Sequence, residues 1–142
     1  MKLRDVMTPN PRTLDSTATV QDAARVMRDA DTGVVPIVEN GKPVGLITDR
    51  DIVVRAVADG AEPTRPVREL ATDTLVTAEP DMSTGEAAEL MGQHQVRRLL
   101  VCEGDRLVGV ASIGDIAVKE GKDRRIGDTL QEISQGVKGQ RS

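Results

Sequence analysis

The sequence contains no phenylalanine, tryptophan or tyrosine among its 142 residues. Proteins that bind single-stranded nucleic acids stack the bases on aromatic rings, so this absence argues against that class. The formal net charge of −4 argues further against a phosphate backbone as the main partner. We therefore expect no nucleic-acid partner, and any flat ligand would have to pack against aliphatic side chains and backbone.

Cysteine and histidine occur once each, as Cys102 and His94. An intramolecular disulfide is therefore excluded, and a zinc site of cysteine and histidine lacks ligands within one chain. Cys102 ends an apolar run at residues 99–102, which predicts a small buried side chain. With no glycine-rich phosphate loop and no paired acid and base, we expect no enzyme, no metal site and no required cofactor.

Long apolar runs are missing as well. The stretch at residues 34–38 is the longest, and it is far too short to span a bilayer. Charged residues open the sequence, and no apolar segment of the signal-peptide type follows them. We therefore expect a cytoplasmic protein with no membrane partner.

An internal repeat is the main positive feature of the sequence. Shifted by 64 positions, the separation of Asp51 and Asp115, the chain aligns with itself without a gap. A half of about 60 residues buries only a modest core, so each half is expected to need the other. We assign residues 1–58 to repeat one, 59–66 to an exposed linker, 67–121 to repeat two and 122–142 to a C-terminal tail.

Each repeat predicts the order β-α-β-β-α, after a short helical turn at residues 3–7 or 67–71. Asn40-Gly41 between two apolar runs is typical of a β-hairpin. A second helix follows the last strand directly, from Asp49 in one repeat and from Ile113 in the other. In the tail we expect a short amphipathic turn at residues 126–133 and disorder at residues 136–142. The first helix is predicted from apolar residues at helical spacing: Val20, Ala23, Ala24 and Met27.

The candidate site is a hydroxyl and a carboxylate three residues apart where a strand meets a helix. Thr48 and Asp51 form it in repeat one, and Ser112 and Asp115 in repeat two. Backbone N–H groups at a helix start favour anions, and the side chains could bind a ribose diol. The same spacing is also typical of a capping box, in which the side chains only satisfy the helix itself. It recurs at two further helix starts, residues 19–22 and 83–86, so spacing alone does not identify a site.

Asp5-Val6-Met7-Thr8, Pro36-Ile37-Val38 and the glycine–threonine–aspartate pattern ending at Asp51 resemble the cystathionine β-synthase (CBS) domain family. Two such repeats over residues 3–121 resemble a tandem CBS pair, or Bateman module. The resemblance implies an α+β fold whose two repeats pack sheet to sheet with pseudo-twofold symmetry. It also implies two clefts between the repeats, which in many members bind adenosine nucleotides such as AMP or ATP, or related adenosyl ligands.

The resemblance implies that Asp51 with Thr48 holds ribose in one cleft, and Asp115 with Ser112 in the other. Backbone and small side chains would flank the base, at Thr13, Val35 and Pro36 in repeat one and at Thr77, Leu99 and Leu100 in repeat two.

The two repeats differ where a phosphate would need positive charge. Arg97 and Arg98 align with Gly33 and Val34, and they become the best phosphate candidates in the light of the resemblance. Without it they are a solvated entry to a strand. Arg50 aligns with Gly114, and Leu100 replaces the proline that is usual in the family. We therefore expect at most one cleft to bind a polyphosphate well.

These observations favour a non-catalytic regulatory module that binds an adenosine-containing ligand and signals to an unknown protein partner. The alternative is a structural, dimerisation or protein-docking module whose clefts are vestigial. In both cases we expect a homodimer, because amphipathic helices outside a two-repeat core are readily buried against a second copy.

Overall fold

The structure contains two small sheets, and each half of the sequence contributes one β-hairpin to one of them. The computed structural model describes residues 1–120 and Ile133. These residues group into two compact units, which are described separately below. Unit 1 contains Met1–Asn10 and the chain from Val76 onward, and unit 2 contains Pro11–Leu75.

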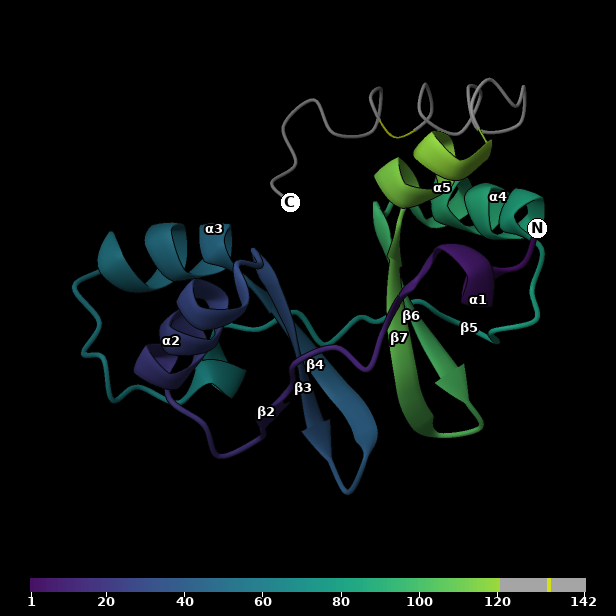
Figure 1. Cartoon of the computed structure of the whole chain (residues 1–142). Helices are drawn as coiled ribbons and strands as arrows, with labels where there is room; N and C mark the ends of the chain where they lie inside the picture. Colours follow the sequence, from purple (N-terminus) through teal and green to yellow (C-terminus); the bar gives the residue numbers. More distant parts are fainter. Residues whose placement is uncertain (121–132, 134–142) are drawn as a thin grey trace. The chain divides into compact units, whose positions relative to one another are not determined.

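Unit 2 contains a three-stranded sheet in the order β2-β3-β4. The strand β2 pairs in parallel with β3, and β3 pairs antiparallel with β4. The predicted Asn-Gly hairpin is confirmed, because Asn40 and Gly41 join β3 to β4 with φ angles of 52° and 81°. The helices α2 and α3 lie on one side of this sheet (Figure 1). The elements are β2 (Leu14–Asp15), α2 (Val20–Ala30), β3 (Val34–Glu39), β4 (Lys42–Thr48), α3 (Asp49–Asp51) and the π-helical segment η1 (Ile52–Val57).

Unit 1 has the same sequence of strand, helix, β-hairpin and helix, and its sheet has four strands in the order β1-β7-β6-β5. The predicted β-α-β-β-α order is therefore confirmed in both halves, and the fold is of the α+β class. Cys102, in β6, is buried as expected, and burial raises the pKa of its thiol. The elements are α1 (Leu3–Val6), β1 (Thr8–Pro9), β5 (Thr77–Ala78), α4 (Thr84–His94), β6 (Arg98–Glu103), β7 (Arg106–Ser112) and α5 (Ile113–Glu120).

The first helix of each repeat buries one face against its own sheet. In α2 the buried residues are Val20, Ala23 and Met27, as the helical spacing predicts. Ala24 was expected to belong with them, but it is exposed. It directly follows Ala23, a step of more than a quarter of a revolution, and the buried face of α2 does not extend that far, unlike the wider buried face of α4. In α4 the buried residues include Ala87, Ala88 and Met91.

The opening segment of each repeat packs in the unit that holds the sheet of the other repeat. The segment containing α1 and β1 pairs antiparallel with β7, and Thr8 lies opposite Val110. Leu3 is fully buried in the core of unit 1. Figure 1 shows this purple segment beside the green strands of the second repeat.

The repeat-related segment lies in unit 2. It contains the short 3-10 helix η2 (Val67–Glu69), and both Val67 and Leu70 are buried in the core of that unit. Leu46 and Thr72 then form a single antiparallel bridge. The opening turns were predicted correctly as local structure, and the structure adds the exchange between the repeats.

Repeat-related glycines make room for these exchanged segments. A Cβ on Gly109 would clash with the side chain of Met7 and would lie 3.1 Å from the carbonyl oxygen of Thr8. A Cβ on Gly45 would lie 3.4 Å from the Cβ of Ala71. The glycine of each second hairpin strand therefore marks the place where the opening segment of the other repeat crosses it.

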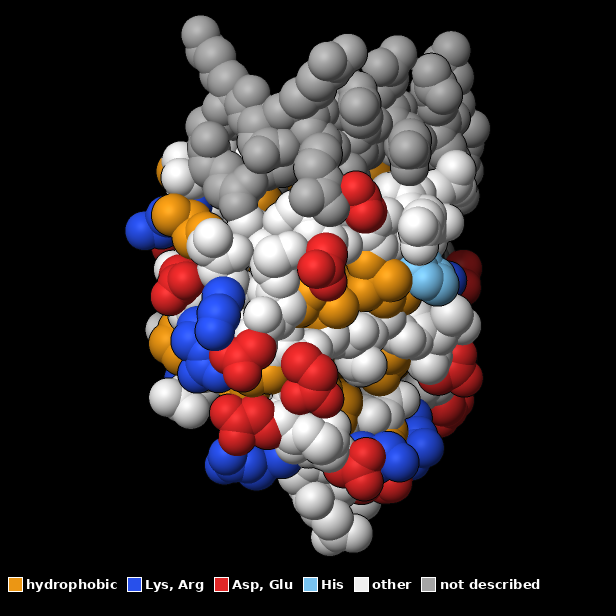
Figure 2. Space-filling model, turned by 90° about the vertical axis from the view of Figure 1, so that its right-hand side faces the viewer, with side chains coloured by type: hydrophobic (Ala, Val, Ile, Leu, Met, Phe, Trp, Pro, Cys, Tyr) orange, Lys and Arg blue, Asp and Glu red, His pale blue; other side chains and the backbone are white. Residues whose placement is uncertain are grey.

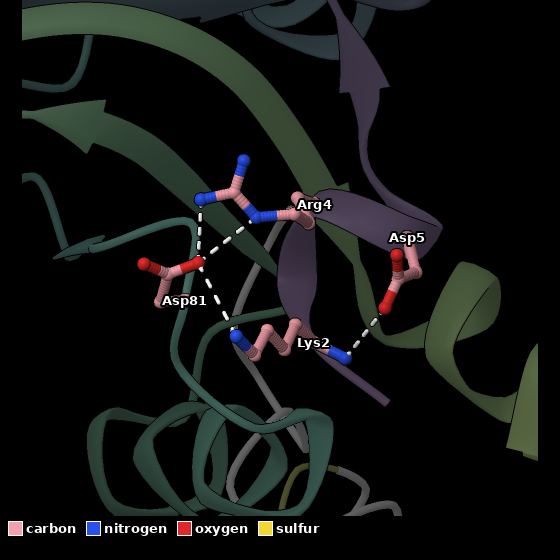
Figure 3. A network of polar contacts seen from close by, with 4 residues as sticks. All are labelled: Lys2, Arg4, Asp5 and Asp81. Atoms are coloured by element: carbon pink, nitrogen blue, oxygen red, sulfur yellow. Dashed lines mark hydrogen bonds and ion pairs between the residues drawn. The ribbon is translucent and has the colours of Figure 1, made fainter.

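Polar contacts add to this packing at the N-terminus. The Arg4 side chain donates a hydrogen bond from Nε to Asp81 Oδ1 over 2.9 Å, and Lys2 lies 3.7 Å from the same oxygen (Figure 3). Asp5 accepts a hydrogen bond from the backbone N–H of Lys2. The hydrogen bond from Arg4 holds the pKa of the Asp81 carboxyl below its usual value.

The C-terminal predictions lie outside the described residues, except at Ile133. That side chain is buried in the core of unit 1. Among the described residues, no helix has the length and apolar character needed to cross a membrane.

Candidate functional site

The candidate site of repeat one lies at the junction of β4 and α3. Thr48, the last residue of β4, lies opposite Val34 in the sheet. Its backbone N–H donates to Asp51 Oδ2 over 2.9 Å, and the Asp51 N–H donates to Thr48 Oγ1 over 3.1 Å. The predicted capping box is therefore present. It uses one carboxylate oxygen of Asp51, and Oδ1 has no hydrogen-bond partner within the described part of the chain.

Repeat two has the same junction between β7 and α5. The Ser112 N–H donates to Asp115 Oδ2 over 3.3 Å, and the Asp115 N–H donates to Ser112 Oγ over 3.0 Å. Ser112 lies opposite Arg98 in the sheet. All four side chains of the two junctions, Thr48, Asp51, Ser112 and Asp115, are half-buried.

The starts of the first helices provide an internal comparison. Thr19 and Asp22 form a complete capping box at α2, whereas at α4 Ser83 accepts from the Glu86 N–H but, among the described residues, its own N–H makes no reciprocal bond to the Glu86 carboxylate. At α2, the next two backbone N–H groups donate to the carbonyl oxygens of Arg65 and Pro63. The linker therefore occupies the start of α2, and this box is fully accounted for as a cap.

The residues expected to flank a base divide evenly between the two units. In unit 2, Thr13 is exposed beside β2, Pro36 is buried, and Val35 is part of the core. In unit 1, Thr77 and Leu100 are neighbours in the parallel pair of β5 and β6. Leu99 belongs to the core. The side chains of Val35 and Leu99 are fully buried in packing, so they are not available for contacts with a ligand.

Arg97 and Arg98 lie directly beside the start of α5. The Ile113 N–H donates to the Arg97 carbonyl oxygen over 2.8 Å. Arg98 is the first residue of β6 and lies opposite Ser112 in β7. Arg97 is exposed and Arg98 is half-buried. The structure therefore places the backbones of both predicted cations beside the junction of repeat two.

At the junction of repeat one, the equivalent backbone bond joins the Asp49 N–H to the Gly33 carbonyl oxygen over 2.9 Å. The Asp49 carboxylate lies over Gly33, because a Cβ on Gly33 would be 3.0 Å from Oδ2. Asp49 lies within the predicted site, but sequence reasoning assigned it no role of its own. The alignment of the two repeats contained a signal for this residue, because Gly33 and Asp49 align with Arg97 and Ile113 and differ from them in charge.

Arg50, the third predicted cation, follows Asp49. Its Nε is buried and has no hydrogen-bond partner among the described residues. Its backbone N–H donates to Asp49 Oδ1 over 2.8 Å. Two carboxylates therefore flank the single arginine in residues 49–51.

Other kinds of site find little support within residues 1–120 and Ile133. In that part of the chain, no three histidine, cysteine, aspartate or glutamate side chains group as metal ligands would. On the face shown in Figure 2, basic and acidic side chains are interspersed, without a continuous basic field. Such a field would favour a nucleic-acid backbone.

The family model of the CBS domain matches residues 3–57 and again residues 67–119. The chain belongs to the CBS domain family. The CBS domain-containing protein YhcV of Bacillus subtilis is 39% identical over 132 residues, which cover 93% of this chain and 94% of YhcV. Most of this CBS pair therefore aligns with another CBS protein of similar length.

Solved structures with the same fold include Hypoxic Response Protein I with two coordinated zinc ions. That protein is 34% identical, with a TM-score of 0.73 over 83% of this CBS chain and 98% of its own. CBSX2 in complex with AMP has a TM-score of 0.70 over 84% of this chain and 95% of its own. At 20% identity, the second likeness shows the fold alone.

Proposed function

We propose that this CBS pair is a non-catalytic regulatory module that binds an adenosine-containing ligand at its strand-to-helix junctions. The hydroxyl and carboxylate of each junction would hold the ribose, and the buried backbone around Pro36 and Leu100 would flank the base. Binding would alter the packing of the module, and a protein partner would read the change. The proposal includes the cytoplasmic location and the homodimer expected from the sequence.

The capping geometry is the observation that carries this proposal. Asp51 and Asp115 each use one carboxylate oxygen for the cap, through Oδ2. The other oxygen has no hydrogen-bond partner within residues 1–120, so capping and ribose binding are compatible in one side chain. A carboxylate can accept several hydrogen bonds at once. Family membership in both repeats, and AMP in a neighbour that shares the fold, supply the ligand class.

A docking or dimerisation module with vestigial sites is the second candidate. The complete capping boxes favour it, because they satisfy the helix starts without any ligand. On this view Asp51 contributes only stability. Replacing such a capping residue by alanine costs about 0.5–2 kcal/mol.

Calorimetric titration of the full chain with adenosine, AMP, ATP, NAD and S-adenosylmethionine distinguishes the two. The proposal expects saturable heat with at least one of them, and a melting temperature that rises with ligand concentration. In Asp51→Ala and Asp115→Ala combined, the ligand-dependent rise should disappear.

The matched control is Asp22→Ala, which removes a capping carboxylate of the same geometry at α2. This variant should lose about as much stability as Asp51→Ala or Asp115→Ala alone, and it should keep the full ligand response. If folded wild-type protein binds none of the five compounds, the docking module is the better account.

A further inference from the structure

We infer that the two junctions select ligands of different charge. The junction of repeat two takes a phosphorylated adenosine compound, and that of repeat one takes an uncharged or cationic one. The inference rests on the proposed function and adds to it which class of ligand each site accepts. The residues that decide are Gly33 and Asp49 in repeat one, and Arg97 and Arg98 in repeat two.

The first step is the place that the Asp49 carboxylate occupies. Its Oδ2 would be 3.0 Å, and its Cγ 3.3 Å, from a Cβ on Gly33. A side chain at residue 33 would therefore press against this carboxylate, which would have to move by a few tenths of an ångström. Glycine at residue 33 allows an acid to cover the first residue before β3.

The second step is the inversion of charge at the equivalent place in unit 1. Arg97 aligns with Gly33, and the same backbone hydrogen bond is present in both repeats, from the Asp49 N–H to Gly33 and from the Ile113 N–H to Arg97. Repeat one has glycine before β3 and an acid, Asp49, at the helix start. Repeat two has a cation before β6 and an apolar residue at the helix start. Ile113 is buried in the core of unit 1, so it does not oppose the arginine.

The third step is the total formal charge around each helix start. In repeat one, Asp49 and Asp51 outnumber Arg50, which leaves a net negative charge in residues 49–51. In repeat two, residues 113–115 carry only the charge of Asp115, and Arg97 and Arg98 outnumber it because they stand in place of the uncharged Gly33 and Val34. A phosphate group carries negative charge at neutral pH, so the first junction repels it and the second attracts it.

Guanidinium geometry strengthens this difference. Arginine binds phosphate oxygens through two parallel hydrogen bonds, and two adjacent arginines offer several such donors. At the junction of repeat one, the backbone N–H of Arg50 already donates a hydrogen bond to Asp49 Oδ1. This N–H group is therefore not available to a phosphate. A neutral ribose needs only the carboxylate and hydroxyl that both junctions share.

Titration calorimetry with adenosine, AMP and S-adenosylmethionine tests the inference on the full chain. Adenosine should bind both sites, AMP only one with high affinity, and the sulfonium compound should favour the other. In Arg97→Gly combined with Arg98→Val, the affinity for AMP should fall by on the order of tenfold or more, with adenosine unchanged.

The reciprocal variant, Gly33→Arg combined with Asp49→Ile, gives repeat one the residues of repeat two at these two positions. It should gain a second AMP site of high affinity. The φ angle of Gly33 lies outside the left-handed region, so the backbone accepts a side chain once Asp49 is removed. Asp49→Asn alone is the milder variant if the double variant folds poorly, and it should gain AMP affinity in the same direction.

Charge controls away from the junctions are Asp59→Asn in the linker and Arg106→Gln at the first residue of β7. Both residues are exposed, and neither variant should change the number of AMP sites. Equal AMP affinity at two wild-type sites, with adenosine also binding both, would overturn this inference and leave the proposed function standing. If no adenosine compound binds, both fail. Loss of AMP binding in Arg50→Gln, but not in the Arg97 and Arg98 variant, would place the phosphate at repeat one and also overturn it.

Discussion

Leu46 and Thr72 exchange two backbone hydrogen bonds, each of 2.9 Å. Leu46 is in the last strand of repeat one, and Thr72 follows the opening turn of repeat two. In unit 1, Thr8 pairs with Val110. Thr8 is 64 positions before Thr72, and Val110 is 64 positions after Leu46, so the two pairs are equivalent. Each sheet is therefore completed by the opening segment of the other repeat.

The crossing points should be sensitive to any added side chain. We expect Gly109→Val to lower the free energy of unfolding by about 1–3 kcal/mol, because it overpacks the contact with Met7. Chemical denaturation of the purified variant measures this. Gly114→Ala is the control, since its Cβ would meet only Ser112 Oγ at 3.7 Å and the change favours a helix. Equal stability of Gly109→Val and wild type would show that the segment does not dock at Gly109.

The opening segment should be essential to the core of the second repeat. Leu3→Ala removes a fully buried side chain from unit 1 and should cost about 2–5 kcal/mol. Met1→Ala is the comparison, because Met1 is 61% exposed and should change stability little. Thermal and urea unfolding of both variants provide the measurement, and a Leu3→Ala variant as stable as Met1→Ala would contradict it.

Splitting the chain in the linker should leave two fragments that each lack part of a core. Residues 1–62 lack Val67 and Leu70, and the second fragment lacks Leu3 and Val6. We expect neither fragment to fold alone and the mixture to regain native circular dichroism. A fragment that unfolds cooperatively by itself would show that the exchanged segments are dispensable.

Acid should weaken the ion pair between Arg4, in the opening segment, and Asp81, in the loop before α4. The Arg4 hydrogen bond lowers the pKa of Asp81 in the folded state. The unfolded chain therefore binds a proton first, and this contribution to stability is complete at neutral pH. It is lost as the pH falls below about 4 towards the lower folded-state pKa. In urea unfolding at pH 7 and pH 3, Asp81→Asn should lose less stability between the two values than wild type does. Identical losses would exclude Asp81 from the acid response.

The turn of the first hairpin should require glycine. Gly41 has a φ angle of 81°, a conformation that L side chains rarely adopt. We expect Gly41→Ala to cost on the order of 1 kcal/mol, because the added Cβ strains the backbone without meeting any neighbour. Guanidinium denaturation gives the value. A neutral result would mean that the turn adopts another conformation.

Local structure was largely predictable because its causes are local. The hairpin needs residues such as Asn40 and Gly41 that accept a positive φ, and α2 needs buried residues on one face. The capping boxes at Thr48 and Ser112 were foreseen in the same way, since three residues of spacing bring a side chain to a backbone N–H. The positions that align between the repeats also indicated Arg97 and Arg98, whose backbones lie beside the second junction.

The sequence by itself therefore determined the elements, the twofold repetition and the residues present at each junction. Only the tertiary structure decided which sheet receives each opening segment, because a strand edge accepts any backbone and the choice depends on distant contacts such as Met7 against Gly109. It also decided that the Asp49 carboxylate lies over Gly33. That contact depends on the missing side chain of a residue 16 positions earlier, which hydrogen bonding between β3 and the end of β4 brings within reach.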